Sequence, residues 1–161
     1  MSSTIDILGY LAGATRFRRL SERFYSDGDK VYKEAGIKFK ASWFPVYYVL
    51  AVAESPLTIL QIAEKIDFTH ITVKNVLREL ELEELVTNDP NPADKRSKLA
   101  SLSRKAQKLI YRLKPLWLSF AAAHKNIFQS GHPDFLNILN RIDRKIEEDP
   151  INIMVAQRES L

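Results

Sequence analysis

The stretch TILQIAEKIDFTHITVKNVLREL (residues 58–80) decides the fold, because it predicts two short helices joined by a tight turn. Thr58 followed three residues later by Gln61 is the pattern of a capping box, in which side chain and backbone of both residues satisfy each other at the start of a helix. Thr69 is a candidate cap for the second helix. In that second helix, apolar residues recur at i, i+3, i+4 and i+7, which assigns to the buried face Val73, Val76, Leu77 and Leu80.

The opposite face of the second helix carries a set of side chains suited to base edges. At about 100° per residue, this outer face gathers Ile71, Lys74, Asn75 and Arg78, flanked by Thr69, His70 and Thr72. Arginine or lysine suits guanine, asparagine suits adenine, and an aliphatic group suits the thymine methyl. An ordinary solvated helix face is the alternative interpretation.

The next segment predicts a hairpin with a basic tip. Leu85, Val86 and Thr87 favour a strand, and residues 98–102 favour a second strand that pairs back. Pro90 and Pro92 disfavour a helix between them. The tip carries Lys95, Arg96 and Lys98. A helix-turn-helix followed by such a hairpin is the winged-helix arrangement, in which the second helix enters the major groove of DNA. The tip would then reach a minor groove, whose negative potential attracts arginine.

The flanking segments are also helical by periodicity. Apolar residues between Ile5 and Phe24 predict one long helix or two short ones, ended by Gly28 and Gly36. The segment SWFPVYYVLAVA (residues 42–53) predicts a central helix that Ser42 caps. After the hairpin, Ser103 begins a helix that Pro115 is expected to kink or interrupt, and two further helices follow. Their apolar stripes either fill the core of one chain or join two chains. A two-fold dimer matches DNA half-sites roughly 34 Å apart, which favours the joining of two chains.

Charge and composition narrow the function. The 161 residues carry a net charge of +4 and no cysteine, and no apolar run reaches the ~20 residues of a membrane span. Residues 79–94 include acidic residues but no basic one, whereas residues 95–133 include basic residues but no acidic one. Either the charges of the two segments neutralise each other in the fold, or the basic segment forms a surface for a polyanion. We find no phosphate loop, GxSxG or HExxH motif and no cluster of metal ligands, so we expect a cytoplasmic protein that is not an enzyme and holds no cofactor.

Residues 56–106 resemble the MarR family of bacterial transcription regulators, through the D-x-R signature at 94–96 and the L-S-x-K-A close at 102–106. The resemblance implies a mainly α fold with a small β-hairpin wing, and one domain over residues 1–161. In it, a winged helix-turn-helix core (56–106) lies between dimerisation helices (1–36 and 107–161). It also implies a homodimer on a palindromic operator, with Asp94 orienting Arg96. Asn75 stands where many members have arginine, and Glu84 where members often have a helix-ending glycine.

The same resemblance implies a dimeric repressor that a small aromatic acid releases from double-stranded DNA. Candidate effector residues are Arg16, Trp43, Tyr47, Tyr48 and Trp117, although aromatic residues at helical spacing more often belong to a core. The segments RLSERFYSDGDKVYKEAG and LKPLWLSF resemble the regulator halves of MarR–acetyltransferase fusion proteins; we expect a free-standing regulator here. The alternative function is a winged helix that binds protein without specific DNA binding, which the acids of residues 79–94 would suit.

Overall fold

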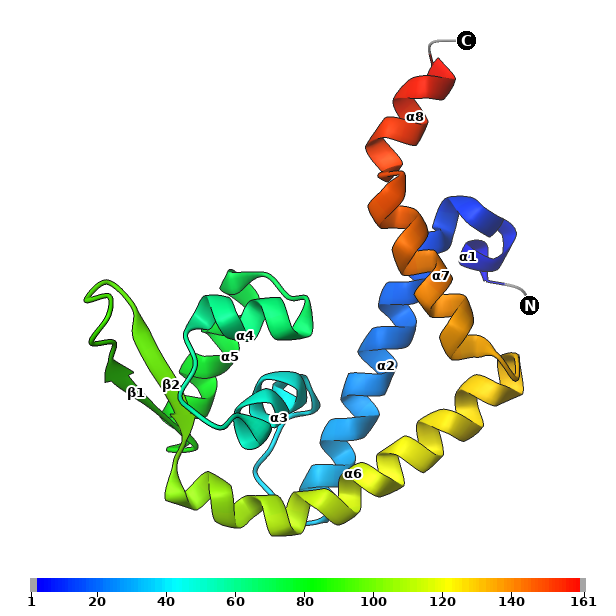
Figure 1. The fold of residues 1–161 in the computed structure, drawn as a ribbon. Coiled ribbons are helices and arrows are strands. Elements are labelled where there is room, and N and C mark those ends of the chain that lie inside the picture. Colours follow the sequence, from blue (N-terminus) through cyan, green and yellow to red (C-terminus); the bar gives the residue numbers. More distant parts are fainter. Residues whose placement is uncertain (1–2, 160–161) are drawn as a thin grey trace. The chain divides into compact units, whose positions relative to one another are not determined.

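The computed structural model describes residues 3–159 as helices and one hairpin (Figure 1). The elements are α1 (Thr4–Ile7), the 3-10 turn η1 (Gly9–Ala12), α2 (Gly13–Glu34), the 3-10 turn η2 (Ala41–Trp43), α3 (Phe44–Val52), α4 (Ile59–Ile66), α5 (His70–Leu82), β1 (Val86–Pro90), β2 (Lys98–Leu102), α6 (Arg104–Gly131), α7 (Phe135–Glu148) and α8 (Ile151–Glu159). This confirms the mainly α fold with a hairpin. The chain forms two compact units, the first ending at Ile110 and the second beginning at Tyr111, within α6.

The helix-turn-helix of the first unit forms as the sequence predicts. Thr58 caps α4: its Oγ1 accepts from the Gln61 backbone amide at 3.2 Å, and the Gln61 Oε1 accepts from the Thr58 backbone amide at 2.8 Å. Thr69 caps α5, and its Oγ1 accepts from the Thr72 amide at 3.1 Å. The predicted stripe of α5 is buried throughout, from Val73 to Leu80. Local capping and periodicity were therefore sufficient to define both helices.

The hairpin is a two-stranded antiparallel sheet in which Val86 pairs with Leu102 and Pro90 with Lys98. Its base is attached to the rest of the first unit by Leu57, which exchanges backbone hydrogen bonds with Ala100 at 3.0 and 2.7 Å. Val86, Ala100 and Leu102 are buried. The base of the hairpin is consequently part of the core, whereas its tip is exposed.

Aromatic side chains dominate the core between α2, η2 and α3. The Phe39 ring lies at the centre, with edge-on neighbours Tyr32 at 4.9 Å, Tyr47 at 5.1 Å and Trp43 at 5.6 Å. Edge-to-face pairs of this kind are favourable beyond the apolar area that they bury. Tyr47 also donates from its hydroxyl to the Ala106 carbonyl at 2.6 Å, and burial raises the pKa of this phenol. The start of α6 is thereby held against α3.

Two details of the flanking helices, at Gly28 and at Ser42, differ from the sequence-based expectations. Gly28 lies buried inside α2 and does not end it, since a single glycine within a helix costs only about 1 kcal/mol. Gly36, with φ of +64°, does follow the helix end. Ser42 lies within η2, so α3 begins without a side-chain cap. Pro115 lies inside α6 and does not interrupt it.

The end of α5 places a glutamate in a conformation that favours glycine. Glu84 has φ of +59°, and the backbone makes both bonds of a Schellman motif, from the Glu84 amide to the Glu81 carbonyl (2.9 Å) and from the Leu85 amide to the Leu80 carbonyl (2.8 Å). Leu80 and Leu85 are both buried, which supplies the apolar contact of that motif. The fold therefore imposes the left-handed conformation on Glu84, at a cost of roughly 1 kcal/mol or more.

Glu84→Gly is expected to raise the free energy of unfolding by about 1 kcal/mol, because glycine adopts this conformation without strain. The variant also loses the ion pair between Glu84 and Lys105 (3.3 Å), but the Glu84 side chain is 83% exposed, so this loss is small. Urea denaturation measures the change. Glu84→Ala is the matched control, since it removes the same ion pair and retains the strain; equal stability of the two variants would contradict the explanation.

The second unit comprises the rest of α6 with α7 and α8. Aromatic rings follow one another from α6 to α7. The ring centroids lie 5.9 Å apart for Phe120 and His124, 6.0 Å for His124 and Phe128, and 5.2 Å for Phe128 and Phe135. No residue of α7 is buried, although its apolar stripe is the one predicted from the sequence. Among residues 3–159, no helix is both long enough and apolar enough to cross a membrane.

Candidate nucleic-acid interface

The outward face of α5 presents the side chains predicted to contact base edges. Ile71 is 61% exposed although it is apolar, and Lys74, Asn75 and Arg78 are exposed beside it. Thr69, His70 and Thr72 are exposed at the start of the helix. The hydroxyls of Thr69 and Thr72 lie 2.9 Å apart, so part of their hydrogen-bonding capacity serves the helix cap. The buried stripe on the opposite side fixes which face of α5 is available to a partner.

The hairpin tip, residues 91–97, is held in shape by its own short polar side chains. Asn91 donates from Nδ2 to the Ser97 Oγ at 2.8 Å and accepts from the Ala93 amide at 3.0 Å. The Ser97 amide donates to the Asp94 carbonyl at 3.0 Å. These bonds close the loop, while Lys95, Arg96 and Lys98 extend into solvent. The loop is thus ordered by groups other than its bases.

Asp94 contacts Arg96 in two ways. Its Oδ1 accepts from the Arg96 backbone amide at 3.0 Å and lies 3.6 Å from the Arg96 Nε. The first distance is that of a hydrogen bond, whereas the second is that of a looser ion pair. The Arg96 side chain is 95% exposed. The acid therefore shapes the backbone at Arg96 and lies close enough to attract its guanidinium.

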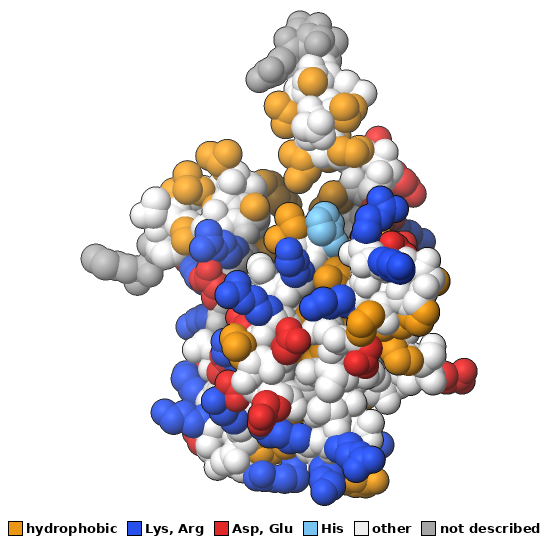
Figure 2. Space-filling model, turned by 90° about the vertical axis from the view of Figure 1, so that its left-hand side faces the viewer, with side chains coloured by type: hydrophobic (Ala, Val, Ile, Leu, Met, Phe, Trp, Pro, Cys, Tyr) orange, Lys and Arg blue, Asp and Glu red, His pale blue; other side chains and the backbone are white. Residues whose placement is uncertain are grey.

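The charges of this surface are mixed and largely sorted into pairs. Figure 2 shows basic side chains spread over one face of the molecule with acidic ones between them. Three glutamates in the last turn of α5 or directly after it are paired with lysines: Glu79 with Lys40, Glu83 with Lys38, and Glu84 with Lys105. Within the described part of the chain, no ion pair engages Lys74, Arg78, Lys95 or Lys98. These four basic side chains are accordingly available to the phosphates or the nucleobases of a nucleic acid.

The five candidate effector residues are not gathered in one place within the first unit. Trp43 and Tyr47 belong to its aromatic core, whereas Tyr48 is 46% exposed, with the Phe44 ring 5.5 Å away. Arg16 donates to Asp6 at 3.2 Å and to the Ile5 carbonyl at 3.3 Å. Trp117 lies in the second unit.

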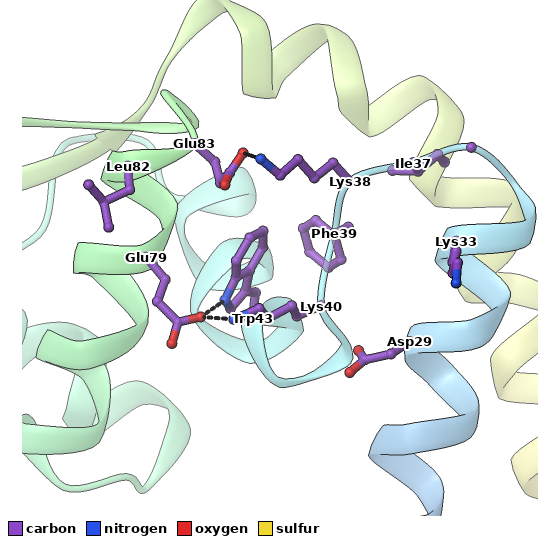
Figure 3. Close-up of a pocket in the computed structure, with 11 residues that line it drawn as sticks. Asp29, Lys33, Ile37, Lys38, Phe39, Lys40, Trp43, Glu79, Leu82 and Glu83 are labelled. Carbon is purple, nitrogen blue, oxygen red and sulfur yellow. Dashed lines mark hydrogen bonds and ion pairs between the residues drawn. The ribbon is translucent and has the colours of Figure 1, made fainter.

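A cavity of about 580 Å³ adjoins the end of α5, and only Trp43 of the effector candidates lines it (Figure 3). Its wall combines the end of α2, the segment that joins α2 to η2, and α5. Its lining includes Lys38, Phe39, Lys40, Trp43, Glu79 and Glu83. Glu79 is not among the predicted site residues; the signal for it in the sequence is its place directly before buried Leu80 and one turn after buried Val76. Residues 3–159 contain no cluster of side chains suited to a metal ion.

Comparison with solved structures assigns the fold. No family model matches the sequence, and no curated protein matches it significantly. The structure of S. aureus MepR bound to DNA is similar, with a TM-score of 0.67 and 19% identity over 81% of this chain and 96% of that chain. A MarR/EmrR-family transcriptional regulator from Acinetobacter gives 0.68 and 16%, over 88% and 98% of the two chains. M. tuberculosis MOSR in complex with DNA gives 0.68 and 18%, over 86% and 98%. The resemblance found in residues 56–106 is confirmed in structure: the chain has the fold of the MarR-family transcription regulators.

Proposed function

We propose that this chain is a sequence-specific double-stranded DNA-binding transcription regulator that acts as a dimeric repressor on a palindromic operator. One observation carries the proposal: the exposed set Ile71, Lys74, Asn75 and Arg78 on α5 lies in the same unit as an exposed basic hairpin tip. An aliphatic group, an amide and bases together match the base edges of a major groove. MepR, CouR and MOSR, which share the fold, have each been crystallised with DNA, which supports the proposal.

The competing function, a winged helix that binds protein, depended on the acids of residues 79–94. Glu79, Glu83 and Glu84 are paired with lysines of the same unit, so these acids do not form an unbalanced acidic surface. A gel-shift assay with random duplex DNA at low salt separates the two functions. DNA binding should weaken steeply as salt rises, because phosphate contacts release counterions. Absence of any shift at low salt would favour the protein-binding function.

Selection of bound duplexes from a random pool tests the proposed function directly. We expect a palindromic motif whose half-sites lie about 34 Å apart, which is one turn of DNA. A motif without two-fold symmetry would contradict the dimeric mode of binding, and a pool that shows no enrichment would contradict sequence-specific recognition.

Asn75→Ala is expected to relax one position of the selected motif, because asparagine pairs with adenine through two hydrogen bonds. The loss of discrimination should be about 1 to 3 kcal/mol per half-site, with little change in the affinity for random DNA. Affinities for the operator and for the three other base pairs at that position measure it. Lys65→Ala, on α4, is a control for a removed polar surface group. Uniform weakening across all sequences would instead identify Asn75 as a phosphate contact.

Release by a small aromatic acid is a separate proposal. Trp43 reports on it, because it lines the cavity and the chain has one other tryptophan, Trp117. In a Trp117→Phe variant we expect salicylate to change the Trp43 fluorescence at saturable concentrations, with benzyl alcohol as the uncharged control. Arg16, if it binds the acid, must exchange its ion pair with Asp6 for the new carboxylate. A flat titration would count against this pocket.

A further inference from the structure

The C-terminal end of α5 is held to the segment before α3 by hydrogen bonds and ion pairs. The Glu79 Oε2 accepts from the Lys40 Nζ at 2.7 Å and from the Trp43 Nε1 at 2.7 Å (Figure 3). One turn later, Glu83 pairs with the Lys38 Nζ at 2.7 Å. We call Glu79, Lys40 and Trp43 the α5 clamp.

The indole bond is the rigid part of this clamp. Trp43 is 3% exposed, and its ring packs edge-on against Phe39 in the aromatic core. The Glu79 and Lys40 side chains are 45% and 52% exposed, so their ion pair is a weak restraint in water. Both bonds favour the charged carboxylate: the hydrogen bonds from Lys40 and then Trp43 lower the pKa of Glu79. The acid is thus ionised at neutral pH and anchored to a side chain that cannot easily move.

Rotation of α5 about its axis is the quantity that this anchor controls. The apolar stripe of the helix holds it against the core, but apolar contact is not directional, whereas hydrogen bonds are. A rotation of about 10° moves a group roughly 6 Å from a helix axis by about 1 Å. Recognition geometry tolerates only about 0.5 Å of misplacement. Asn75 lies one turn before Glu79 on the same helix, so a rotation at Glu79 is transmitted to it.

We propose that Glu79 is a positioning residue for DNA recognition, which sets the rotation of α5 through Trp43 and Lys40 so that Asn75 and its neighbours meet the base edges. This role rests on the proposed function. Glu79 does not contact DNA, and it acts on specificity more than on overall affinity. Simple electrostatics predicts a different result for its removal, because an acid lost near a polyanion should tighten binding to every sequence.

The test compares affinities for the selected operator and for a random duplex of equal length. Glu79→Ala is expected to lower the operator-to-random ratio about tenfold, the effect of losing one good base contact. Glu81→Ala is the matched control: it removes the same charge from an exposed position two residues away, and its ratio should equal that of the wild type. Glu79→Gln keeps an oxygen that can accept from the indole, and should restore the ratio to within about threefold of the wild type.

Trp43→Phe provides a second test that does not depend on the stability of Glu79→Ala. It retains an aromatic ring in the core and removes the N–H donor, so it should lower the ratio by a similar factor. Thermal unfolding of each variant confirms that the fold persists at the assay temperature. A ratio in Glu79→Ala equal to that in Glu81→Ala, or an unchanged ratio in Trp43→Phe, would overturn the positioning role. A wild-type protein without any preferred sequence would instead overturn the proposed function, a distinguishable outcome.

Discussion

Arg96→Ala is expected to weaken binding to the selected operator at least about 100-fold, while the free energy of unfolding stays within about 0.5 kcal/mol of the wild-type value. Arg96 is 95% exposed, so its side chain contributes little to the fold. A narrow minor groove concentrates negative potential, and an inserted guanidinium is worth most there. Each protomer of a dimer would lose one such contact, so the losses add. Equilibrium binding to the operator and urea denaturation measure the two quantities.

Lys95→Ala is the matched control for this variant. Lys95 is the neighbouring exposed base, and we assign it with Lys98 to phosphates. Its removal should weaken binding nearly equally for operator and random DNA, and should reduce the salt dependence by about one counterion per site. If Arg96→Ala gave the same modest and uniform loss as Lys95→Ala, the minor-groove role of Arg96 would be wrong.

The two contacts of Asp94 lead to a finer expectation for the same loop. Asp94→Ala removes the acceptor of the Arg96 amide (3.0 Å) and should weaken operator binding, even though it removes a negative charge near a polyanion. Asp94→Asn keeps an oxygen for that amide and should retain most of the affinity, because the guanidinium contact at 3.6 Å is the weaker one. Tighter binding by Asp94→Ala would show that this acid only repels DNA.

Pro92 and the hydrogen bonds of Asn91 and Ser97 explain why the loop is stiff. A loop that is ordered before binding loses fewer conformations when it enters a groove. Asn91 and Ser97 make these bonds in the free protein, at 2.8 Å between side chains. The conformational entropy of the basic tip is therefore lost when the protein folds and not when it binds.

Leu11→Glu is expected to convert a homodimer into a monomer and to weaken operator binding about 100-fold or more, because two linked half-site contacts become one. The first unit exposes an apolar band at its N-terminal end, composed of Ile7 (76%), Leu8 (45%), Leu11 (84%), Phe17 (51%) and Leu20 (45%). Several large apolar side chains exposed in one region of the chain are typical of an interface. A two-fold dimer would bury it against the same band of a second copy. Light scattering at micromolar concentration gives the mass.

Val52→Glu is the control for this variant, since Val52 is another exposed apolar residue of the first unit, at the end of α3 (61% exposed). Its mass should remain that of a dimer. Circular dichroism should show both variants folded, because neither position is buried. A wild-type protein that is monomeric at micromolar concentration and still binds the operator with full affinity would contradict the dimeric arrangement.

The sequence by itself determined the features that depend on near neighbours along the chain. The caps Thr58 and Thr69 act over three residues, and the stripe of α5 repeats within two turns. The starts of α4 and α5 and the exposed set from Ile71 to Arg78 therefore followed from local rules. The second strand, Lys98–Leu102, followed in the same way, whereas the first strand runs to Pro90, beyond the predicted Leu85–Thr87. Departures arose where burial outweighed a local preference: Gly28 continues α2, and Glu84 adopts a left-handed conformation at the turn that brings Leu85 into the core.

Only the tertiary structure decided which distant groups meet. Glu79 meets Trp43 across 36 residues, and the Tyr47 hydroxyl meets Ala106 across 59. Periodicity identifies Glu79 as a boundary residue, but a hydrogen bond needs an atom within about 3 Å, and that position depends on how whole elements pack. For the same reason the sequence left Trp43 and Tyr47 open between a core, the commoner place for such aromatics, and a pocket wall, and the packing around Phe39 placed them. Local interactions fix which elements form. Burial of their apolar faces brings the elements together, and this decides which partner each polar or aromatic group meets.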